Sequence, residues 1–306
     1  MVNTMINAMC QIEPCYNAWA TPIEPQEGNA AGQVYWIVNR LKGDNKKLNI
    51  LFNNDVLVNH NYYGDEPSFA ILRESPSILE WYHTNVYKAQ GSFFDAMCRL
   101  MKSKTNKFKT LYTFDKRYEG LPNTVIVPAC SGTFIADKNN RSLYEGEKNN
   151  LITFVTSNKQ MTEEQRIRVR LANHLNNSGI KVYGKGFDEV ICKSEVMRNS
   201  MFCFAIENGI YKGYHSEKLI DCFLTGCVPI YMGDPDISEF FDTDGMIICE
   251  TEKKLHQKLT EITPELYQKM LPHIRKNFEI ATKYYALGTL EPHITMMYRE
   301  LIDENN

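Results

Sequence analysis

Several features are missing from this 306-residue chain, and each absence excludes a class of protein. None of its nine cysteines forms a CxxC pair, and their odd number and wide spacing argue against a disulfide framework or a zinc site. Cys203 and Cys222 lie inside apolar runs, which is typical of buried, reduced thiols. We therefore expect a protein of a reducing compartment.

Long hydrophobic runs and an excess of positive charge are also missing. No stretch is apolar enough to span a bilayer, and the first residues, MVNTMINAMCQIEPC, lack the basic start and apolar block of a signal peptide. The formal net charge of −3 does not indicate a strongly basic face for nucleic acid. The sequence thus predicts a cytoplasmic protein that has no transmembrane segment and does not bind nucleic acid.

What is present is the composition and length of a globular α/β protein with two domains. Hydrophobic residues make up 43% of the chain and charged residues 23%. The first half has short strand-like runs at 47–52, 69–72 and 124–127, with a mostly helical stretch at 77–100. A polar segment at 137–150 is typical of a connection, so we place a domain boundary near Asn150.

The second half alternates strands and helices more clearly, which predicts a parallel, Rossmann-like sheet. The predicted strands are 151–155, 180–183, 202–206, 227–232 and 246–249, the predicted helices are 162–178 and 216–225, and 263–306 is helical in character. The predicted domains are 1–150 and 151–290, followed by a helix at 291–306 that could cross back onto the first domain.

Polar side chains are concentrated between the two apolar runs of the segment 202–233. Glu207 and Asn208 end a buried strand, and the carboxyl ends of strands in an open α/β sheet face the ligand crevice. Glu217 and Lys218 fall in the first turn of the next helix, where the exposed amides and the helix dipole favour an anion. The local pattern also fits an ordinary helix cap beside a core strand, so it leaves both interpretations open.

As a whole, this segment resembles the donor-binding signature of glycosyltransferase family 10, which contains the α-1,3/α-1,4-fucosyltransferases. The resemblance lies in FxFxxEN, GYxSEKLxD and GxVPIYxG, in that order. It implies a GT-B fold, with two Rossmann-like domains facing across a cleft, the donor mainly on the second domain and the acceptor on the first. It also implies an inverting transfer of L-fucose from GDP-fucose to a glycan hydroxyl, without a metal or other cofactor.

The same resemblance bears on localisation. Animal members of the family are anchored in the Golgi by an amino-terminal helix, so this chain either departs from that plan or is a catalytic fragment of a membrane-anchored protein. We expect a soluble cytoplasmic enzyme, as in bacterial members.

Arg168 is the first candidate outside the signature. On a helical wheel it falls within the apolar stripe of the helix at 162–178, whereas Arg166 points outward and Arg170 lies at the edge. A buried arginine needs an anionic partner, and an acidic side chain of the protein is one such partner. Family resemblance, through Ser157 and Asn158 at the preceding strand end, implies that Arg168 clamps the diphosphate together with Lys218. Because the loop between Asn158 and Arg168 is longer than usual in the family, Arg166 and Arg170 are fallback assignments.

Glu74 is the candidate catalytic residue. It follows the apolar run 69–72 within Glu-Ser-Pro, which resembles a family motif whose glutamate is the general base. An inverting transfer needs a carboxylate that deprotonates the acceptor hydroxyl as it attacks the anomeric carbon. Without that resemblance, the same residues fit a surface glutamate before a turn proline.

The remaining assignments also come from the resemblance. Tyr214 and Glu217 resemble residues that contact the donor's sugar and ribose, and Asn208 would orient the donor. His215 and Ser216 depart from the family's usual residues: serine preserves the helix cap, whereas His215 leaves the donor sugar open.

Two DxD triplets, at Asp234/Asp236 and Asp242/Asp244, match the pattern by which another glycosyltransferase fold holds a divalent metal. Such triplets arise often in loops, so we expect no metal there. The turn at 184–186 is too short for a phosphate loop and is interpreted as a strand exit. Rival functions are the same fold with another nucleotide sugar, a metal-dependent transferase, and a non-catalytic glycan-binding protein.

Overall fold

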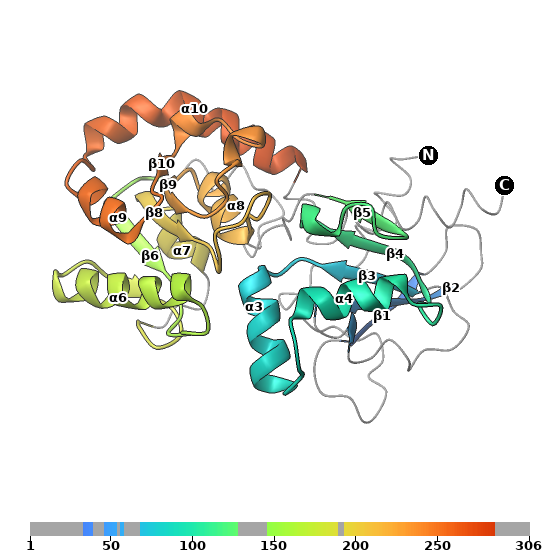
Figure 1. Cartoon of the computed structure of the whole chain (residues 1–306). Coiled ribbons are helices and arrows are strands. Elements are labelled where there is room, and N and C mark those ends of the chain that lie inside the picture. Colours follow the sequence, from blue (N-terminus) through green and yellow to red (C-terminus); the bar gives the residue numbers. More distant parts are fainter. Residues whose placement is uncertain are drawn as a thin grey trace. The chain divides into compact units, whose positions relative to one another are not determined.

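The computed structural model describes residues 33–38, 46–53, 56–57, 68–127, 146–188 and 193–284 (Figure 1). These residues form two compact units. Unit 1 contains the described residues up to Glu74 and those from Leu79 to 127, and unit 2 contains Ser75–Ile78 and 146–284. The helix predicted at 291–306 lies outside the described residues.

Unit 1 is built on a five-stranded sheet of order β1-β2-β3-β4-β5, in which only the β1–β2 pair is antiparallel. The strands are β1 (Gln33–Val38), β2 (Lys46–Phe52), β3 (Ser68–Leu72), β4 (Phe108–Thr113) and β5 (Thr124–Ile126). The helices are α3 (Pro76–Trp81), which continues into a π-helical turn (Tyr82–Val86), α4 (Phe93–Lys102) and a 3-10 turn (Lys116–Tyr118).

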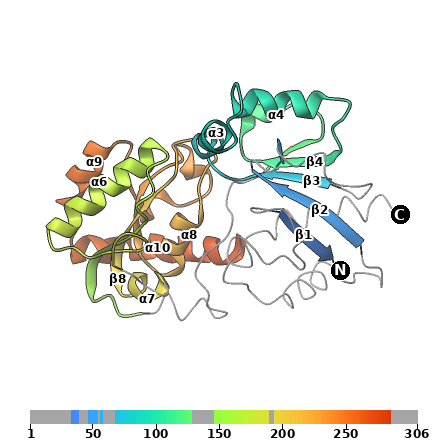
Figure 2. The ribbon, with the colours of Figure 1, turned by 90° about the horizontal axis from the view of Figure 1, so that it is seen from below.

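The core of unit 1 lies between this sheet and α4, which runs along it beside β4 (Figure 2). All five residues of β3 are buried, as expected for a parallel strand covered on both faces. Met97 and Leu100 of α4 belong to the same buried cluster as Ala70 and Leu111 of the sheet. The core of this unit therefore fixes where β3 ends, and the candidate base Glu74 follows that end.

Unit 2 is built on a second five-stranded sheet, of order β10-β9-β8-β6-β7, in which every pair is parallel. Its strands are β6 (Asn150–Val155), β7 (Val182–Tyr183), β8 (Ser200–Ile206), β9 (Val228–Met232) and β10 (Ile247–Ile248). Its helices are α6 (Glu163–Asn177), α7 (Lys193–Met197), α8 (Glu217–Leu224), α9 (Glu252–Leu259) and α10 (Pro264–Tyr284), with 3-10 turns at Ile237–Glu239 and Thr243–Gly245.

The strand order of unit 2 reverses at β6. The chain leaves β6 to form β7 on one side of it and then returns to form β8 on the other side. In open α/β sheets the crevice outside the carboxyl ends of the strands at such a reversal is the usual place of a ligand. Topology therefore directs attention to the residues that follow β6 and β8.

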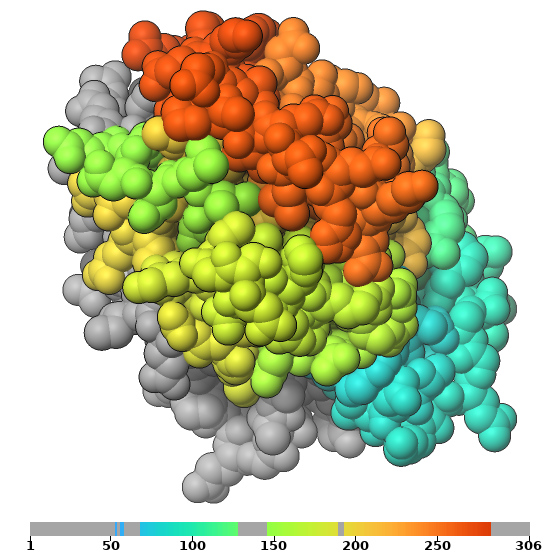
Figure 3. All heavy atoms as spheres, turned by 90° about the vertical axis from the view of Figure 1, so that its left-hand side faces the viewer, coloured from blue at the N-terminus to red at the C-terminus, as the bar shows by residue number. Residues whose placement is uncertain are grey.

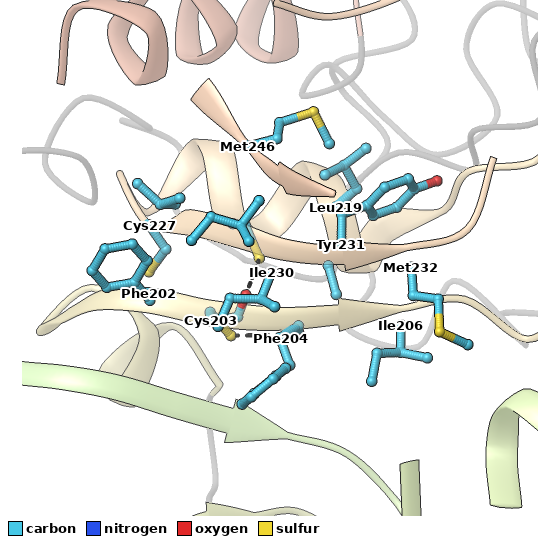
Figure 4. Close-up of a cluster of buried hydrophobic side chains, with 14 of the residues drawn as sticks. Phe202, Cys203, Phe204, Ile206, Leu219, Cys227, Ile230, Tyr231, Met232 and Met246 are labelled. Carbon is cyan, nitrogen blue, oxygen red and sulfur yellow. Dashed lines mark hydrogen bonds between the residues drawn. The ribbon is translucent and has the colours of Figure 1, made fainter. Parts of the chain in front are cut away.

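A continuous hydrophobic core surrounds β8 and β9 (Figure 4). Phe202, Phe204 and Ile230 contribute to it from the strands, and Leu219 contributes from α8. Each of these side chains is at most 3% exposed. The two strands are therefore fixed on both faces, and the polar residues that follow them are held by a rigid frame.

The cysteines of unit 2 belong to this core. Cys203, Cys222, Cys227 and Cys249 are buried free thiols, which confirms the core-like setting inferred from their apolar neighbours. Burial raises the pKa of the Cys227 thiol to about 11, which disfavours its reactive thiolate form.

In unit 2, α6 lies beside α9 (Figure 3). Arg170 of α6 pairs with Glu252 of α9 at 2.8 Å, and the rings of His174 and His256 are 5.1 Å apart. No helix of the described residues is both long and apolar enough to cross a membrane.

The structure bears out most predicted elements and adds others. The predicted helix at 77–100 is interrupted before α4 by Lys88 and Gly91, whose φ angles of 53° and 78° are left-handed and end helical geometry. Sequence patterns missed β4, because Lys109 and the threonines divide its apolar run, although five of its six residues are buried in the sheet between β3 and β5. They also missed β1, α7 and α9.

Candidate functional site

The predicted binding residues of unit 2 gather at the carboxyl ends of its central strands. Ser157 and Asn158 follow β6, and Glu207 and Asn208 follow β8. Lys218 is the second residue of α8, the helix that connects β8 to β9. The strand order alone brings these groups to one edge of the sheet, at the reversal point described above.

Glu207 is the centre of this arrangement. Its carboxylate is fully buried and accepts hydrogen bonds from the Ser216 N–H (2.8 Å) and the Ser216 hydroxyl (2.6 Å). The Lys218 ammonium lies 3.4 Å from the same carboxylate. A buried carboxylate is tolerated when hydrogen bonds and an opposite charge compensate its lost hydration, and both are present here. Glu207 therefore ties the end of β8 to the start of α8.

Gly233 makes room for Glu207. A Cβ atom at this position would lie 2.6 Å from Glu207 Cγ and 2.5 Å from the Tyr231 hydroxyl oxygen, closer than real Cβ atoms approach other heavy atoms. Gly233 does not have a left-handed φ, so the requirement here is space rather than backbone conformation. This gives a physical reason for the glycine that ends the GxVPIYxG pattern.

Lys218 is held by three oxygen atoms at the start of α8. Its ammonium donates to the Ser216 hydroxyl at 2.8 Å and, over longer distances, to Glu217 at 3.3 Å and Glu207 at 3.4 Å. The Lys218 side chain keeps 22% of its surface exposed. Burial alone would raise the pKa of the Glu217 carboxyl, but the charges of Lys218 and Lys193 lower it overall. The helix start thus carries a partly exposed cation between the side chains of Glu207 and Glu217.

Arg168 reaches the same strand end from α6. It is only 5% exposed, and its guanidinium donates to the Ile206 carbonyl at 3.1 Å and to Asn208 Oδ1 at 2.9 Å. Gln165, one turn earlier, donates to the same amide oxygen at 3.4 Å. The burial expected from the helical wheel is confirmed, and both of these arginine contacts are to uncharged oxygens.

The two fallback arginines point elsewhere. Arg166 pairs with Glu163 at 2.8 Å, and Arg170 pairs with Glu163 and Glu252, while both arginine side chains keep more than 40% of their surface exposed. Arg168 is therefore the arginine of this helix that contacts the end of β8. Together with Lys218 it contacts three consecutive residues, 206–208, from two different helices.

Ser157 and Asn158 lie on the neighbouring strand exit. The Asn158 N–H donates to the Lys185 carbonyl at 3.0 Å, in the turn that follows β7. A Cβ at Gly186 would lie 2.5 Å from Asn158 Nδ2, so this glycine lets the asparagine pack closely on the turn. The turn at 184–186 is thus a strand exit, as predicted, and it supports the residues that follow β6.

Tyr214 and His215 are both buried in the loop before α8. The His215 ring packs against Phe240 and Phe241, with ring centres 4.7 and 5.7 Å apart, and its Nδ1 is 3.7 Å from Asp234. The histidine that replaces the family's usual aliphatic residue therefore occupies an aromatic environment in the protein interior. Its place in the sequence gave no sign of this packing.

The first DxD triplet serves the loop itself. Asp234 is buried, and its Oδ1 accepts the N–H groups of Gly213 and Asp236 at 2.9 Å each. Asp236 pairs with Lys212 at 3.0 Å. These contacts fix the loop that leads into α8.

The second triplet lies against α10. Asp242, Asp244 and His273 place possible ligand atoms within 4.8 Å of one another. The Asp242 carboxylate already contacts the His273 ring and the Lys276 ammonium, each at 3.0 Å. The hydrogen bond with His273, followed by that from Lys276, keeps the pKa of Asp242 below its usual range. The expectation that no metal binds stays a prediction.

Glu74 follows β3 in unit 1. Its N–H and that of Arg73 donate to the side-chain oxygen of Asn53 at 3.1 and 3.0 Å. Ser75, which is assigned to unit 2, is fully buried and donates to the Asn208 carbonyl at 3.3 Å. Pro76 begins α3 instead of a turn, because its fixed φ suits the first position of a helix.

Two functional contributions were missed by sequence reasoning. The Gln165 N–H donates to the Thr162 hydroxyl at the start of α6 at 3.2 Å, and its side chain accepts the Met161 N–H at 2.7 Å, yet the same side chain also contacts Asn208. Ser216 is the cap of α8, as predicted, and is also the main hydrogen-bond partner of Glu207. For both residues, a role in capping a helix already accounts for the residue type, so nothing in the sequence indicated the tertiary contact.

Comparison with known proteins identifies the class of fold first. The chain is similar to a sucrose-phosphate synthase from Thermosynechococcus elongatus, with a TM-score of 0.55, 10% identity, and coverage of 84% of this chain and 74% of that one. It is also similar to Anabaena HepE, solved with UDP and glucose, with a TM-score of 0.52, 11% identity, and coverage of 82% and 78%. The fold is that of the GT-B glycosyltransferases.

Sequence comparison then shows which family the second half of the chain resembles. Residues 146–284 match the model of "Glycosyltransferase family 10 (fucosyltransferase) C-term". The 4-galactosyl-N-acetylglucosaminide 3-alpha-L-fucosyltransferase 9 of Bos taurus is 27% identical over 144 residues, which cover 45% of this chain and 37% of the bovine protein. The human protein gives the same identity and coverage. The resemblance inferred from the sequence motifs is confirmed: residues 146–284 match the family 10 model, and the chain spans little more than a third of the length of these curated relatives.

Gly233→Ala is expected to destabilise the protein by about 1–3 kcal/mol, because the added methyl group must displace Glu207 or Tyr231. Urea unfolding measures the change. A Gly233→Ala protein as stable as the wild type would contradict the packing described here.

Proposed function

We propose that this protein is an inverting glycosyltransferase that transfers L-fucose from GDP-fucose to a hydroxyl group of a glycan, in the manner of an α-1,3-fucosyltransferase. The observation that carries the proposal is the convergence of Arg168 and Lys218 on residues 206–208, at the strand-order reversal of a family 10 domain. A lysine at the start of a helix, together with an arginine that reaches the preceding strand end, is suited to a nucleoside diphosphate.

The leaving group determines what these cations do. As the bond between fucose and GDP breaks, negative charge grows on the diphosphate and must be stabilised. Lys218, Arg168 and the dipole at the start of α8 supply positive potential for that charge. The Lys218 contacts with Glu207 and Glu217 are the long ones, at 3.4 and 3.3 Å, so these are the contacts that a phosphate oxygen would replace.

The other residues of the strand ends would orient the donor. Asn208, fixed by Arg168 and Gln165, lies next to the position assigned to the diphosphate. Glu217 would contact the ribose and Tyr214 the donor's sugar. Ser157 and Asn158, at the end of β6, would contact the donor from the neighbouring strand.

Glu74 would act as the general base. It would accept the proton of the acceptor hydroxyl while that oxygen attacks the anomeric carbon from the face opposite GDP, which inverts the configuration. The family resemblance of Glu-Ser-Pro and the position of Glu74 directly after β3 support this role. The acceptor glycan and a cytoplasmic, reducing location stay predictions from the sequence.

The donor is tested by screening nucleotide sugars for released nucleotide. We expect turnover with GDP-fucose and none with GDP-mannose or UDP-sugars, because the family signature lies in the segment that would bind the nucleotide and its sugar. Turnover with a different nucleotide sugar would support the rival donor assignment on the same fold. If no donor is consumed with any acceptor, a non-catalytic glycan-binding role becomes the better explanation.

Lys218→Ala is expected to weaken GDP binding by about 10- to 100-fold, because a charge-assisted hydrogen bond to phosphate is lost. Calorimetric titration of GDP measures this. Lys253→Ala is a close control, since Thr251-Glu252-Lys253 repeats at α9 the cap, acid and lysine order of Ser216-Glu217-Lys218, and Lys253 is exposed. If Lys218→Ala and Lys253→Ala bind GDP with equal affinity, Lys218 does not bind the donor.

Glu74→Gln is expected to lower kcat by about 10²- to 10⁴-fold while GDP affinity is unchanged, because only proton transfer is lost. The control is Glu119→Gln, an exposed glutamate of the same unit. Steady-state kinetics with a saturating acceptor give the comparison. Full activity in the Glu74→Gln enzyme would show that Glu74 is not the general base.

Full activity is expected in EDTA, because the proposed charge stabilisation uses side chains and amides of the protein. The relevant rival site is the cluster of Asp242, Asp244 and His273. Loss of activity in EDTA, restored by a divalent cation and abolished by Asp244→Asn, would show that a metal takes part.

A further inference from the structure

The segment that follows Glu74 is fastened to the donor-side strand end. Ser75–Ile78 belongs to unit 2, whereas Glu74 belongs to unit 1. The Ser75 hydroxyl donates to the Asn208 carbonyl at 3.3 Å, and the hydroxyl groups of Ser77 and Tyr211 lie 2.6 Å apart. Ser75 also accepts the Ile78 N–H at 3.3 Å, so the contact with Asn208 and the cap of α3 use the same hydroxyl.

Close packing reinforces these hydrogen bonds. A Cβ at Gly209 would lie 2.6 Å from the Tyr211 ring and 3.2 Å from Ser75 Cβ. The tyrosine ring therefore folds back over Gly209, and the serine lies against the same position. Only glycine at position 209 lets both the tyrosine ring and Ser75 pack this closely. We call the group Ser75, Ser77, Gly209 and Tyr211 the clasp.

Asn208 gives the clasp a connection to the donor. Its carbonyl oxygen accepts from Ser75, while its side-chain oxygen accepts from Arg168 at 2.9 Å. A ligand that restrains Arg168 also restrains Asn208, and through it the segment that begins at Ser75. Because binding suppresses local opening of whatever it contacts, nucleotide at the strand end should stabilise the clasp.

The backbone at Glu74 is held within unit 1 by Asn53. The Asn53 side-chain oxygen accepts the N–H groups of both Arg73 and Glu74. Asn53 itself has a left-handed φ of 52°, which asparagine tolerates better than most residues, and its N–H donates to the Ile71 carbonyl at 2.9 Å. The backbone of Glu74 is thus held by Asn53, and the next residue in the chain is held by the clasp.

We propose that the clasp couples donor binding to the candidate base: nucleotide at the end of β8 fixes Ser75–Ile78 through Asn208, and this fixes the position of Glu74. Ser75, Ser77 and Tyr211 are positioning residues that need not touch either substrate. The inference rests on the proposed function, since it concerns how the proposed base is held. It adds a reason for acceptor activation to follow donor binding, because a base that is held within a fraction of an ångström transfers protons more efficiently.

Hydrogen exchange with GDP as the probe tests the coupling without turnover. We expect GDP to slow exchange at residues 206–218 and also at 76–78 in the wild type (Pro76 has no N–H). In Tyr211→Phe, protection at 206–218 should remain and protection beyond Ser75 should be lost. If GDP protects 206–218 but not the segment after Ser75, the clasp does not couple and the proposed function stands. If GDP protects neither segment, both proposals fail.

Kinetics provide the second test. Tyr211→Phe and Ser77→Ala each remove one hydroxyl of the same pair, so each should lower kcat about fivefold and, because coupling between two sites is reciprocal, also weaken the binding of GDP. The double variant should be no worse than either single one, since the bond is already lost. Ser103→Ala is the control, because it breaks a 2.7 Å hydroxyl pair with Thr105 elsewhere in unit 1 and should leave kcat unchanged. Wild-type kcat in Tyr211→Phe, or a loss confined to thermal stability, would overturn the inference.

Discussion

The buried carboxylate of Glu207 is the interaction on which the rest of the site depends. Placing a charge in the protein interior is costly, and here two hydrogen bonds from Ser216 and the nearby Lys218 ammonium offset that cost. The same contacts fix the start of α8 against the end of β8. Removing one partner of such a buried pair typically costs about 3–5 kcal/mol, so the loop between β8 and α8 has little freedom to rearrange.

Three consecutive residues at the end of β8 distribute the remaining contacts. The Ile206 carbonyl and the Asn208 side chain hold Arg168 of α6, Glu207 holds α8, and the Asn208 carbonyl holds Ser75. Side chains alternate in direction along an extended backbone, so neighbouring positions reach different elements without competing for space. Helix α6, helix α8 and the segment after Glu74 therefore all have hydrogen-bond or ion-pair partners among residues 206–208.

The sequence allowed much of this to be predicted, for physical reasons that also set the limits. Strands β8 and β9 are almost wholly apolar and their boundaries are marked by polar residues, so strand, loop, helix and strand could be located without a structure. Arg168 could be placed on a buried helix face because the period of a helix is fixed. The burial of His215 among Phe240 and Phe241 could not be predicted, because it depends on contacts between residues about 25 positions apart. The role of Gly233 is of the same kind, since the Glu207 side chain that needs its space comes from the end of the neighbouring strand β8.

The charges around α8 show why Lys218 can serve a ligand without unsettling the fold. Glu207, Glu217 and Asp221 are the carboxylates near this helix, and Lys218 and Lys193 are the ammonium groups that pair with them. Asp221, which is fully buried, has its own partner in Lys193. Glu207 keeps its two hydrogen bonds from Ser216 if Lys218 turns toward a phosphate, so no buried carboxylate loses all its donors. The two lysines thus have different roles. Lys193 pairs with a buried carboxylate of α8 and stabilises the helix. Lys218 can exchange its long contacts with carboxylates for a shorter contact with a bound anion.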